Sequence, residues 1–165
     1  MLAEGAMSDW SVNYMQNIAK ASESLAPIGL SAFATSMTVG RLLGDRVRML
    51  LGDKKMIITG GLLAVLGLTI ALAMPDPYLS IAGFFLVGLG LSSIVPIAYS
   101  IAGNTKDLPP GVGLAMVTTV GYSGFLFGPP IIGFIADWHT LRIALGVVAL
   151  LLMLMTLLGV RYKSN

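Results

Sequence analysis

The chain has no cysteine and little charge. None of its 165 residues is Cys, which excludes disulfides, thiol catalysis and cysteine-based metal sites. The only histidine, His139, has no second histidine or cysteine with which to share a metal, so we expect no metal site and no cofactor. Charged residues make up 11% of the chain, against about 25% in a typical soluble domain. This shortage of charge points away from a water-exposed surface.

Enzymatic and nucleic-acid-binding motifs are also missing. Gly88-Leu89-Gly90 and Gly111-Val112-Gly113 resemble the start of a dinucleotide fingerprint, but neither has the third glycine or a preceding strand. There is no nucleotide-binding sequence of the Walker type and no Ser-His-Asp set. The net charge is only +2, and no basic stripe faces aromatic residues. We therefore expect neither an enzyme nor a nucleic-acid partner.

The chain does have long apolar runs. Hydrophobic residues make up 56% of the chain, and its mean hydropathy is +0.86. Each clear run is near the roughly 20 residues that a helix needs to cross a bilayer, and an open sheet is excluded in lipid. The four clear runs and a weaker fifth are Met56–Met74, Tyr78–Ile101, Val112–Ala136, Leu141–Val160 and Ala26–Leu43. The sequence therefore predicts an all-α, polytopic bundle of membrane helices.

The first segment is shorter and more polar than these runs. Residues 1–16 carry Glu4, Asp9 and Trp10, and lack the basic start and apolar centre of a signal peptide. The segment resembles the outer part of a membrane helix whose inner part is absent. We expect five complete transmembrane helices plus a truncated first one, forming a single transmembrane domain over residues 1–165.

Positive charge is concentrated between two of the apolar runs. Short cytoplasmic loops of membrane proteins gather lysine and arginine, because cationic flanks set the orientation during insertion. Half of the ten cations lie in this one connection: Arg41, Arg46, Arg48, Lys54 and Lys55. The pattern predicts that this connection is cytoplasmic and that the lipid bilayer surrounds the runs on either side.

The remaining topology follows by alternation. The C-terminus is then expected to be cytoplasmic, and the five cations above are joined there by Lys106, Arg161 and Lys163. Only Lys20 and Arg142 fall on the outer side. An imbalance of this size favours the predicted orientation.

Polar residues in the first segment are candidates for a transport site. On a helix, Asp9 and Asn13 share one face, with Tyr14 adjacent. Glu4 lies about 140° from Asp9 by the helical period, so the two carboxylates do not share a face. Glu4 or Asp9 is a candidate carrier of a coupling proton, and Asn13 and Tyr14 are candidate substrate contacts. Alternatively, Asp9 and Trp10 lie at the outer interface and Glu4 forms a structural pair.

Glycine, proline and hydroxyl residues mark two later helices. Tyr122 and Ser123 are candidates to line a cavity. Pro96, together with Ser92 and Ser93, marks a kink or a packing contact in the Tyr78–Ile101 run. A second group in the Val112–Ala136 run indicates either a kinked gating helix or a tightly packed one: Gly128, Pro129 and Pro130.

The charged connection resembles a motif of the major facilitator superfamily. The block Gly40-Arg41-Leu42-Leu43-Gly44-Asp45-Arg46, followed by Gly52, Lys54 and Lys55, is similar to the family signature between the second and third helices of each half. The later glycine of the motif is displaced to Gly52, and in this respect the block is similar to the degenerate copy of the motif in the C-terminal half of such transporters. The resemblance implies a cytoplasmic gating motif of Gly40, Arg41, Gly44, Asp45 and Arg46. In it, Asp45 would bond a neighbouring helix end and Arg46 would act in a charge relay.

Two further blocks resemble a bacterial inner-membrane subgroup of that family, the YbjJ type. They are Glu4–Ser11 and Gly121–Gly133. The resemblance implies helices seven to twelve of a permease that transports a small-molecule substrate by alternating access, with protons as a candidate coupling ion. The partner would be the N-terminal half of the same transporter. Two alternatives remain: a half-size protein that pairs with a second copy of this chain, and a membrane interaction subunit without transport.

Overall fold

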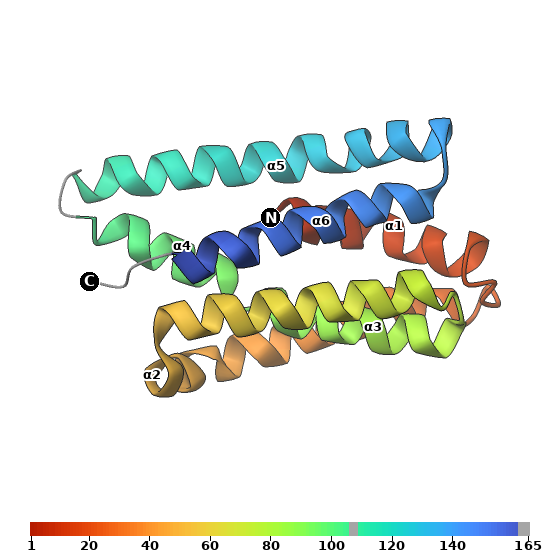
Figure 1. The fold of residues 1–165 in the computed structure, drawn as a ribbon, viewed down its shortest axis with the longest axis horizontal. Helices are drawn as coiled ribbons and strands as arrows, with labels where there is room; N and C mark the ends of the chain where they lie inside the picture. The colour runs from red at the N-terminus through yellow and green to blue at the C-terminus, as the bar shows by residue number, and fades with distance from the viewer. Residues whose placement is uncertain (106–108, 162–165) are drawn as a thin grey trace.

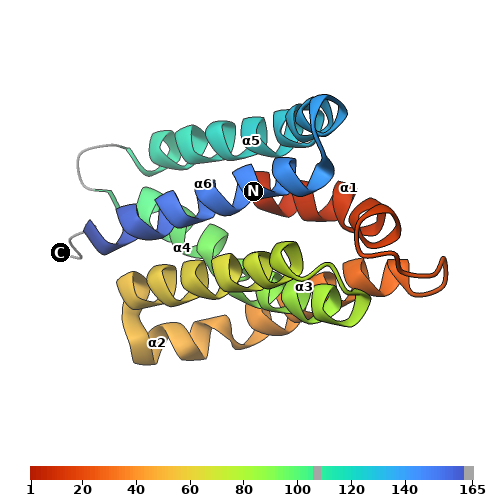
Figure 2. The ribbon, with the colours of Figure 1, turned by 45° about the vertical axis from the view of Figure 1, so that its right-hand side comes forward.

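A computed structural model describes residues 1–105 and 109–161, and every regular element within them is an α-helix. The helices lie along a common long axis, with the connections near the two ends of the bundle (Figure 1; Figure 2). In chain order they are α1 (Leu2–Asn17), α2 (Ala26–Ala73), α3 (Pro77–Leu91), α4 (Ile94–Gly103), α5 (Pro110–Trp138) and α6 (Leu141–Arg161).

Helix α2 is two antiparallel arms joined at a glycine. Gly52 has φ +76° and ψ 162°, a backbone conformation that side-chain-bearing residues rarely adopt. We call residues 26–51 the first arm and residues 53–73 the second arm. The two arms lie side by side in both ribbon views, with the turn at one end of the molecule (Figure 1; Figure 2). They contain two of the predicted apolar runs.

The Tyr78–Ile101 run, predicted as one membrane helix marked by Pro96, is broken close to that proline. Helix α3 ends at Leu91 and α4 begins at Ile94. Pro96 is the third residue of α4, where a first-turn N–H would have no helical partner, so the missing donor costs little. A proline therefore fits this position better as the start of a new helix than as the interior of a long one.

The number of membrane crossings agrees with the sequence prediction. Four stretches of the described residues are long and apolar enough to span a membrane: Ala26–Ala73, Pro77–Gly103, Gly111–Trp138 and Leu141–Arg161. The first of them doubles back at Gly52 and so provides two crossings. Helix α1, with 16 residues, is shorter than the roughly 20 that a crossing needs. The predicted all-α membrane bundle of five spans and one shorter first helix is confirmed.

Glycines let α3 pack closely against both arms of α2. A Cβ atom on Gly60 would lie 2.5 Å from the carbonyl oxygen of Gly90, and Gly67 lies against Gly83 in the same way. On the other side, Gly88 contacts the first arm at Phe33. Helix association in lipid relies on such close backbone approach, because lipid tails are as apolar as the side chains themselves.

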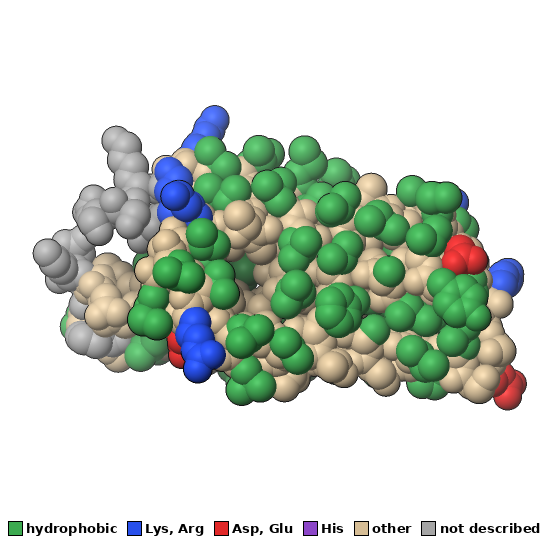
Figure 3. All heavy atoms as spheres, turned by 90° about the horizontal axis from the view of Figure 1, so that it is seen from below, with side chains coloured by type: hydrophobic (Ala, Val, Ile, Leu, Met, Phe, Trp, Pro, Cys, Tyr) green, Lys and Arg blue, Asp and Glu red, His purple; other side chains and the backbone are tan. Residues whose placement is uncertain are grey.

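An aromatic core joins α1 to these helices. Tyr14 is fully buried, and its hydroxyl donates a hydrogen bond to the Ala71 carbonyl at 2.6 Å. Its ring meets that of Phe84 edge to face, with centroids 5.8 Å apart. The outer surface is different: Figure 3 shows apolar side chains along much of one face, with the charged ones gathered towards its two ends. This distribution suits a bundle surrounded by hydrocarbon.

Gly67→Ala should destabilise the protein. The new Cβ would lie 2.7 Å from Leu86 Cβ and against the Gly83 carbonyl, so α2 and α3 would have to separate. Overpacking of this kind costs about 1–3 kcal/mol, measurable as a lower midpoint of thermal unfolding in detergent. The control is Gly146→Ala on α6, where nothing lies within 4 Å of the added atom. Equal midpoints for the two variants would contradict the tight contact.

Candidate functional site

A polar face runs along α1 and the first arm of α2. Asp9 and Asn13 are exposed on α1, one helical turn apart. The exposed hydroxyl residues of the first arm follow the same helical spacing: Ser31, Thr35 and Thr38. Two of these hydroxyls bond to their own helix, Ser31 to Pro27 O at 3.0 Å and Thr38 to Ala34 O at 2.9 Å. Such a surface at membrane depth is costly against lipid and indicates a partner or a water-filled pathway.

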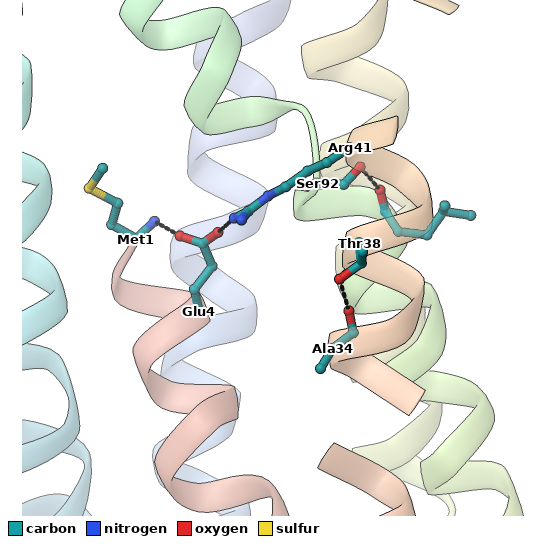
Figure 4. A network of polar contacts seen from close by, with 7 residues as sticks. Met1, Glu4, Ala34, Thr38, Arg41 and Ser92 are labelled. Atoms are coloured by element: carbon teal, nitrogen blue, oxygen red, sulfur yellow. Dashed lines mark hydrogen bonds and ion pairs between the residues drawn. The ribbon is translucent and has the colours of Figure 1, made fainter. Parts of the chain in front are cut away.

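An ion pair connects the two helices of this face. Nη2 of Arg41 donates to Oε1 of Glu4 at 2.9 Å, and the Met1 amine lies 3.1 Å from the other carboxylate oxygen. Figure 4 shows Arg41 reaching from α2 to the carboxylate on α1. The Glu4 side chain is only 12% exposed, whereas that of Arg41 is 50% exposed. Each charge therefore has an opposite charge beside it, and Arg41 remains accessible from the polar face.

The structure separates Tyr14 from the other candidates on α1. Asp9 and Asn13 share the exposed face, as the helical spacing predicts. Oδ1 of Asn13 accepts a hydrogen bond from Nδ2 of Asn17 at 3.1 Å. Tyr14 points into the bundle, where its hydroxyl is bonded to Ala71. The geometry gives Tyr14 a packing role and leaves it no access to a solute on the polar face.

Trp10 fixes α1 against the double proline of α5. Its Nε1 donates to the Pro129 carbonyl at 3.1 Å, and its ring lies over Gly133. Gly5 is close to the Phe125 carbonyl, which lacks a helical donor because residue 129 is proline. Helix α5 continues through this region from Pro110 to Trp138. Pro129 and the buried Gly128 therefore belong to a tightly packed contact, whereas Pro130 is exposed. The gating alternative stays a prediction.

Tyr122 and Ser123 lie on α5, a different helix from those of the polar face. Tyr122 is 61% exposed, and the Ser123 hydroxyl donates to the Thr119 carbonyl at 2.7 Å. Helix α5 and the arms of α2 are on opposite sides of the bundle in both ribbon views (Figure 1; Figure 2). The two residues are thus accessible, and no described hydrogen bond joins them to Ser31 or Thr38.

The glycines of the predicted gating motif, on the first arm of α2, pack against the break between α3 and α4. Gly40 contacts Ser92, and a Cβ on Gly44 would lie 2.8 Å from the Ser93 hydroxyl oxygen. Both glycines are buried, so the first arm approaches the broken helix closely. Pro96 follows this break and is exposed. The motif's glycines therefore have a packing role at the point where the run changes direction.

Beside this motif is a charge cluster that the sequence analysis did not identify. Nη2 of Arg48 donates to Oδ2 of Asp53 at 2.9 Å and to the Ser100 hydroxyl at 2.8 Å. The cluster connects both arms of α2 to α4, whereas Asp45 and Arg46 are exposed. The hydrogen bond from Arg48 lowers the pKa of Asp53, and both side chains lie in the charged connection outside the apolar runs. The sequence pattern that could have indicated this cluster is the pair of opposite charges on either side of Gly52, Arg48 and Asp53.

Charge differs between the two ends of the bundle. The described cations at the Gly52 end are Arg46, Arg48, Lys54, Lys55 and Arg161. Arg161 belongs to this end because its neighbour Gly159 packs against Ile57. The residues in or beside the opposite connections include more acids than bases: Lys20, Arg142, Glu23, Asp76 and Asp137. Lys106 and Lys163, counted in the sequence analysis, lie outside the described residues.

The fold and the charged connection define a multi-pass membrane protein of the transporter class. The family model of the Major Facilitator Superfamily matches residues 4–165, and the chain belongs to that family. No solved structure matches the chain.

Three relatives are informative about the length of such proteins. An uncharacterized MFS-type transporter of Yersinia pestis is 44% identical over 92% of this chain, which is 40% of the relative. The membrane protein MosC of Rhizobium meliloti is 42% identical over 83% of the chain and 34% of its own length. The uncharacterized transporter y4wD of Sinorhizobium fredii is 31% identical over 96% of this chain, which is 42% of the length of that protein. The chain thus spans less than half the length of each relative.

Trp10→Phe should weaken the contact between α1 and α5. The variant keeps an aromatic ring over Gly133 but loses the hydrogen bond to Pro129, which is worth about 0.5–1.5 kcal/mol. We expect a lower midpoint of thermal unfolding in detergent. Trp138→Phe is the matched control, because Trp138 is exposed at the end of α5. A drop of the same size in both variants would show that the Trp10 bond contributes nothing specific.

Proposed function

We propose that this chain is the C-terminal half of a Major Facilitator Superfamily permease and that it moves a small solute by alternating access. The single observation that carries the proposal is the polar face of α1 and the first arm of α2, on a bundle whose other exposed surface is largely apolar. Exposed Asp9 and Asn13 would be costly against hydrocarbon, so the face needs a partner or a water-filled pathway. The length of the relatives supports a second half as that partner.

Proton coupling is assigned to the ion pair in this proposal. Glu4 carries the proton, and Arg41 stabilises its charged form until the proton arrives. Asp9 is the alternative carrier, and Asn13 provides a substrate contact on the same face. Protonation of Glu4 would free the guanidinium of Arg41, and this change in pairing is the kind of local event that biases a two-state transporter. No cofactor and no catalytic step are needed.

The charged end of the bundle forms the cytoplasmic gate. The described cations concentrate around the Gly52 turn, which supports a cytoplasmic position for that turn and for the C-terminus in a bacterial inner membrane. Arg48, Asp53 and Ser100 hold α4 to the arms of α2, and exposed Asp45 and Arg46 are available to the opposite half. Bonds of this kind can break and reform as the two halves rock.

Glu4→Gln should abolish uphill transport in the full-length protein but leave exchange intact. The amide cannot carry a proton, whereas it can still accept a hydrogen bond from Arg41. The assay uses proteoliposomes with a pH gradient and a solute that stabilises the purified wild type. We expect at least a tenfold loss of accumulation, with counterflow within about threefold of wild type. Asp9→Asn is the matched variant: accumulation lost there and kept in Glu4→Gln would transfer the role to Asp9.

Arg48→Ala should slow transport several-fold while the protein still inserts. The variant removes the bonds to Asp53 and Ser100, so α4 loses its connection to the arms of α2. Initial uptake rates in the same proteoliposomes measure the effect, with Arg46→Ala made in parallel. Lys54→Ala is the control, because Lys54 forms no ion pair with another described residue. A normal rate for Arg48→Ala would remove this cluster from the gate.

A short epitope tag after Asn165 distinguishes the proposed function from its alternatives. We expect a native product of at least twice the calculated 17.3 kDa and a tag accessible only from the cytoplasmic side. A product near 17.3 kDa would favour the half-size protein that pairs with a second copy, or the interaction subunit. A tag accessible from the periplasm would overturn the orientation.

A further inference from the structure

An elongated groove of about 350 Å³ lies between the two arms of α2, against the break between α3 and α4. Its lining on the first arm begins at Gly40 and ends at Val47, and on the second arm it begins at Met56 and ends at Leu63. Each stretch covers about 10 Å, since a helix rises 1.5 Å per residue. The groove therefore runs along the helix axes, in the direction in which the bundle crosses the membrane.

The walls of this groove are mostly apolar. Two of the three hydroxyl residues in the lining bond to their own helices, Thr59 to the Lys55 carbonyl at 2.8 Å and Ser92 to the Leu89 carbonyl at 2.7 Å. Ordered water needs two to four polar partners, so an apolar occupant fits this lining better. The large apolar side chains of the lining are Leu43, Val47, Met56, Leu63 and Leu89.

The groove opens on a different side from the polar face. Leu43 is 48% exposed and Val47 is 38% exposed, so the lining is accessible from outside the bundle. By the helical period, the lining residues of the first arm point roughly 160° away from Ser31, Thr35 and Thr38. Figure 3 views the bundle from the side of the α2 arms and shows apolar side chains over much of it. The opening therefore borders lipid.

Two cations lie beside this opening, at the Gly52 end of the bundle. Lys55 precedes Thr59 by one helical turn on the second arm, and Arg46 follows Leu43 by one turn on the first arm. Both cations are exposed, and neither forms an ion pair with another described residue. An apolar groove thus has uncompensated positive charge at one end.

We propose that the groove binds an anionic diacyl phospholipid, with one acyl chain between the arms of α2 and the phosphate beside Lys55. The charge selects this occupant, because an apolar groove alone would accept any acyl chain, whereas cations beside it favour an anionic head group. Lysine suits the site, since its apolar stem can lie along the groove while the ammonium group remains at the polar end.

The other charges of the connection are consistent with this site. The exposed acid Asp45 points roughly 150° away from the lining of the first arm, so it does not face the head group. Arg46 lies between the groove and the polar face, and Lys55 is therefore the cation that belongs to the groove alone. A lipid in this position requires no solute, so the site is independent of the proposed function.

Native mass spectrometry of the full-length protein tests the head-group contact. The protein, delipidated in detergent, is titrated with phosphatidylglycerol or with phosphatidylcholine that has the same acyl chains. We expect one phosphatidylglycerol to bind saturably and about fivefold more tightly than phosphatidylcholine, the effect of one cation near the head group. Lys55→Gln should lose this preference. Lys54→Gln is the matched control and should keep it, because Lys54 points away from the lining of the second arm.

Val47→Phe tests the groove itself. The larger ring would occupy the space of the acyl chain, so the affinity for phosphatidylglycerol should fall at least fivefold. Val39→Phe is the control, because Val39 is 44% exposed on the same arm and does not line the groove. The midpoint of thermal unfolding in detergent checks that each variant folds, and Leu43→Phe replaces Val47→Phe if the latter does not.

Four results would overturn the lipid site. They are equal affinity of the wild type for the two lipids, an equal loss of preference in Lys54→Gln and Lys55→Gln, equal affinities of the two valine variants, and displacement of the lipid by glycerol phosphate at an equal concentration. The last would assign the cations to a free anion. Because the titration measures no transport, these results leave the proposed function untouched, and a protein that carries no solute can still bind the lipid.

Discussion

Hydrocarbon offers no hydrogen-bond partner, and the polar parts of this chain are arranged around that constraint. Hydroxyl side chains on the membrane helices bond back to their own helices, as Ser31, Thr38 and Ser123 do. Glu4 and Arg41, the two opposite charges that meet between α1 and α2, lie within hydrogen-bonding distance of each other. The groups that remain exposed to the side, Asp9 and Asn13 among them, gather on one face. That face is where the solute pathway of the proposed function would lie.

Hydrocarbon also removes the hydrophobic driving force between helices. Close van der Waals contacts at glycine residues stabilise the helix packing instead. Helix α3 packs closely against the second arm of α2 because Gly60, Gly67, Gly83 and Gly90 let the two backbones meet. Helix α1 packs against α5 in a similar way. Glycines on both helices allow close contact, and Trp10 donates a hydrogen bond to the Pro129 carbonyl. Pro129 of α5 is thus part of the contact with α1. The kinked gating helix, which is compatible with this contact, stays a prediction.

These contacts leave two surfaces of different chemistry on the same bundle. The polar face carries Asp9, Asn13 and the hydroxyl residues of the first arm, whereas the pockets around Ile94 are lined by apolar side chains. The chain belongs to the Major Facilitator Superfamily and spans less than half the length of its relatives. The ion pair lies where the two surfaces meet, so events on the polar face and the packing of α1 are physically linked. The charge cluster at Arg48 ties the far end of the bundle to α4.

The sequence by itself determined the features that depend on composition and spacing. Apolar runs of about 20 residues specify membrane helices, and the block from Gly40 to Arg46 resembles the family motif. The clustered cations predict an orientation, which stays a prediction. The sequence also placed Asp9 and Asn13 on one face. The tertiary structure decided which groups meet. It paired Glu4 with Arg41, turned Tyr14 into the core, and joined Arg48 to Asp53 and Ser100. Helical periodicity fixes the direction in which a side chain leaves its helix. The partner that the side chain meets depends on how separate helices pack, and this packing is set by close contacts between residues far apart in the chain.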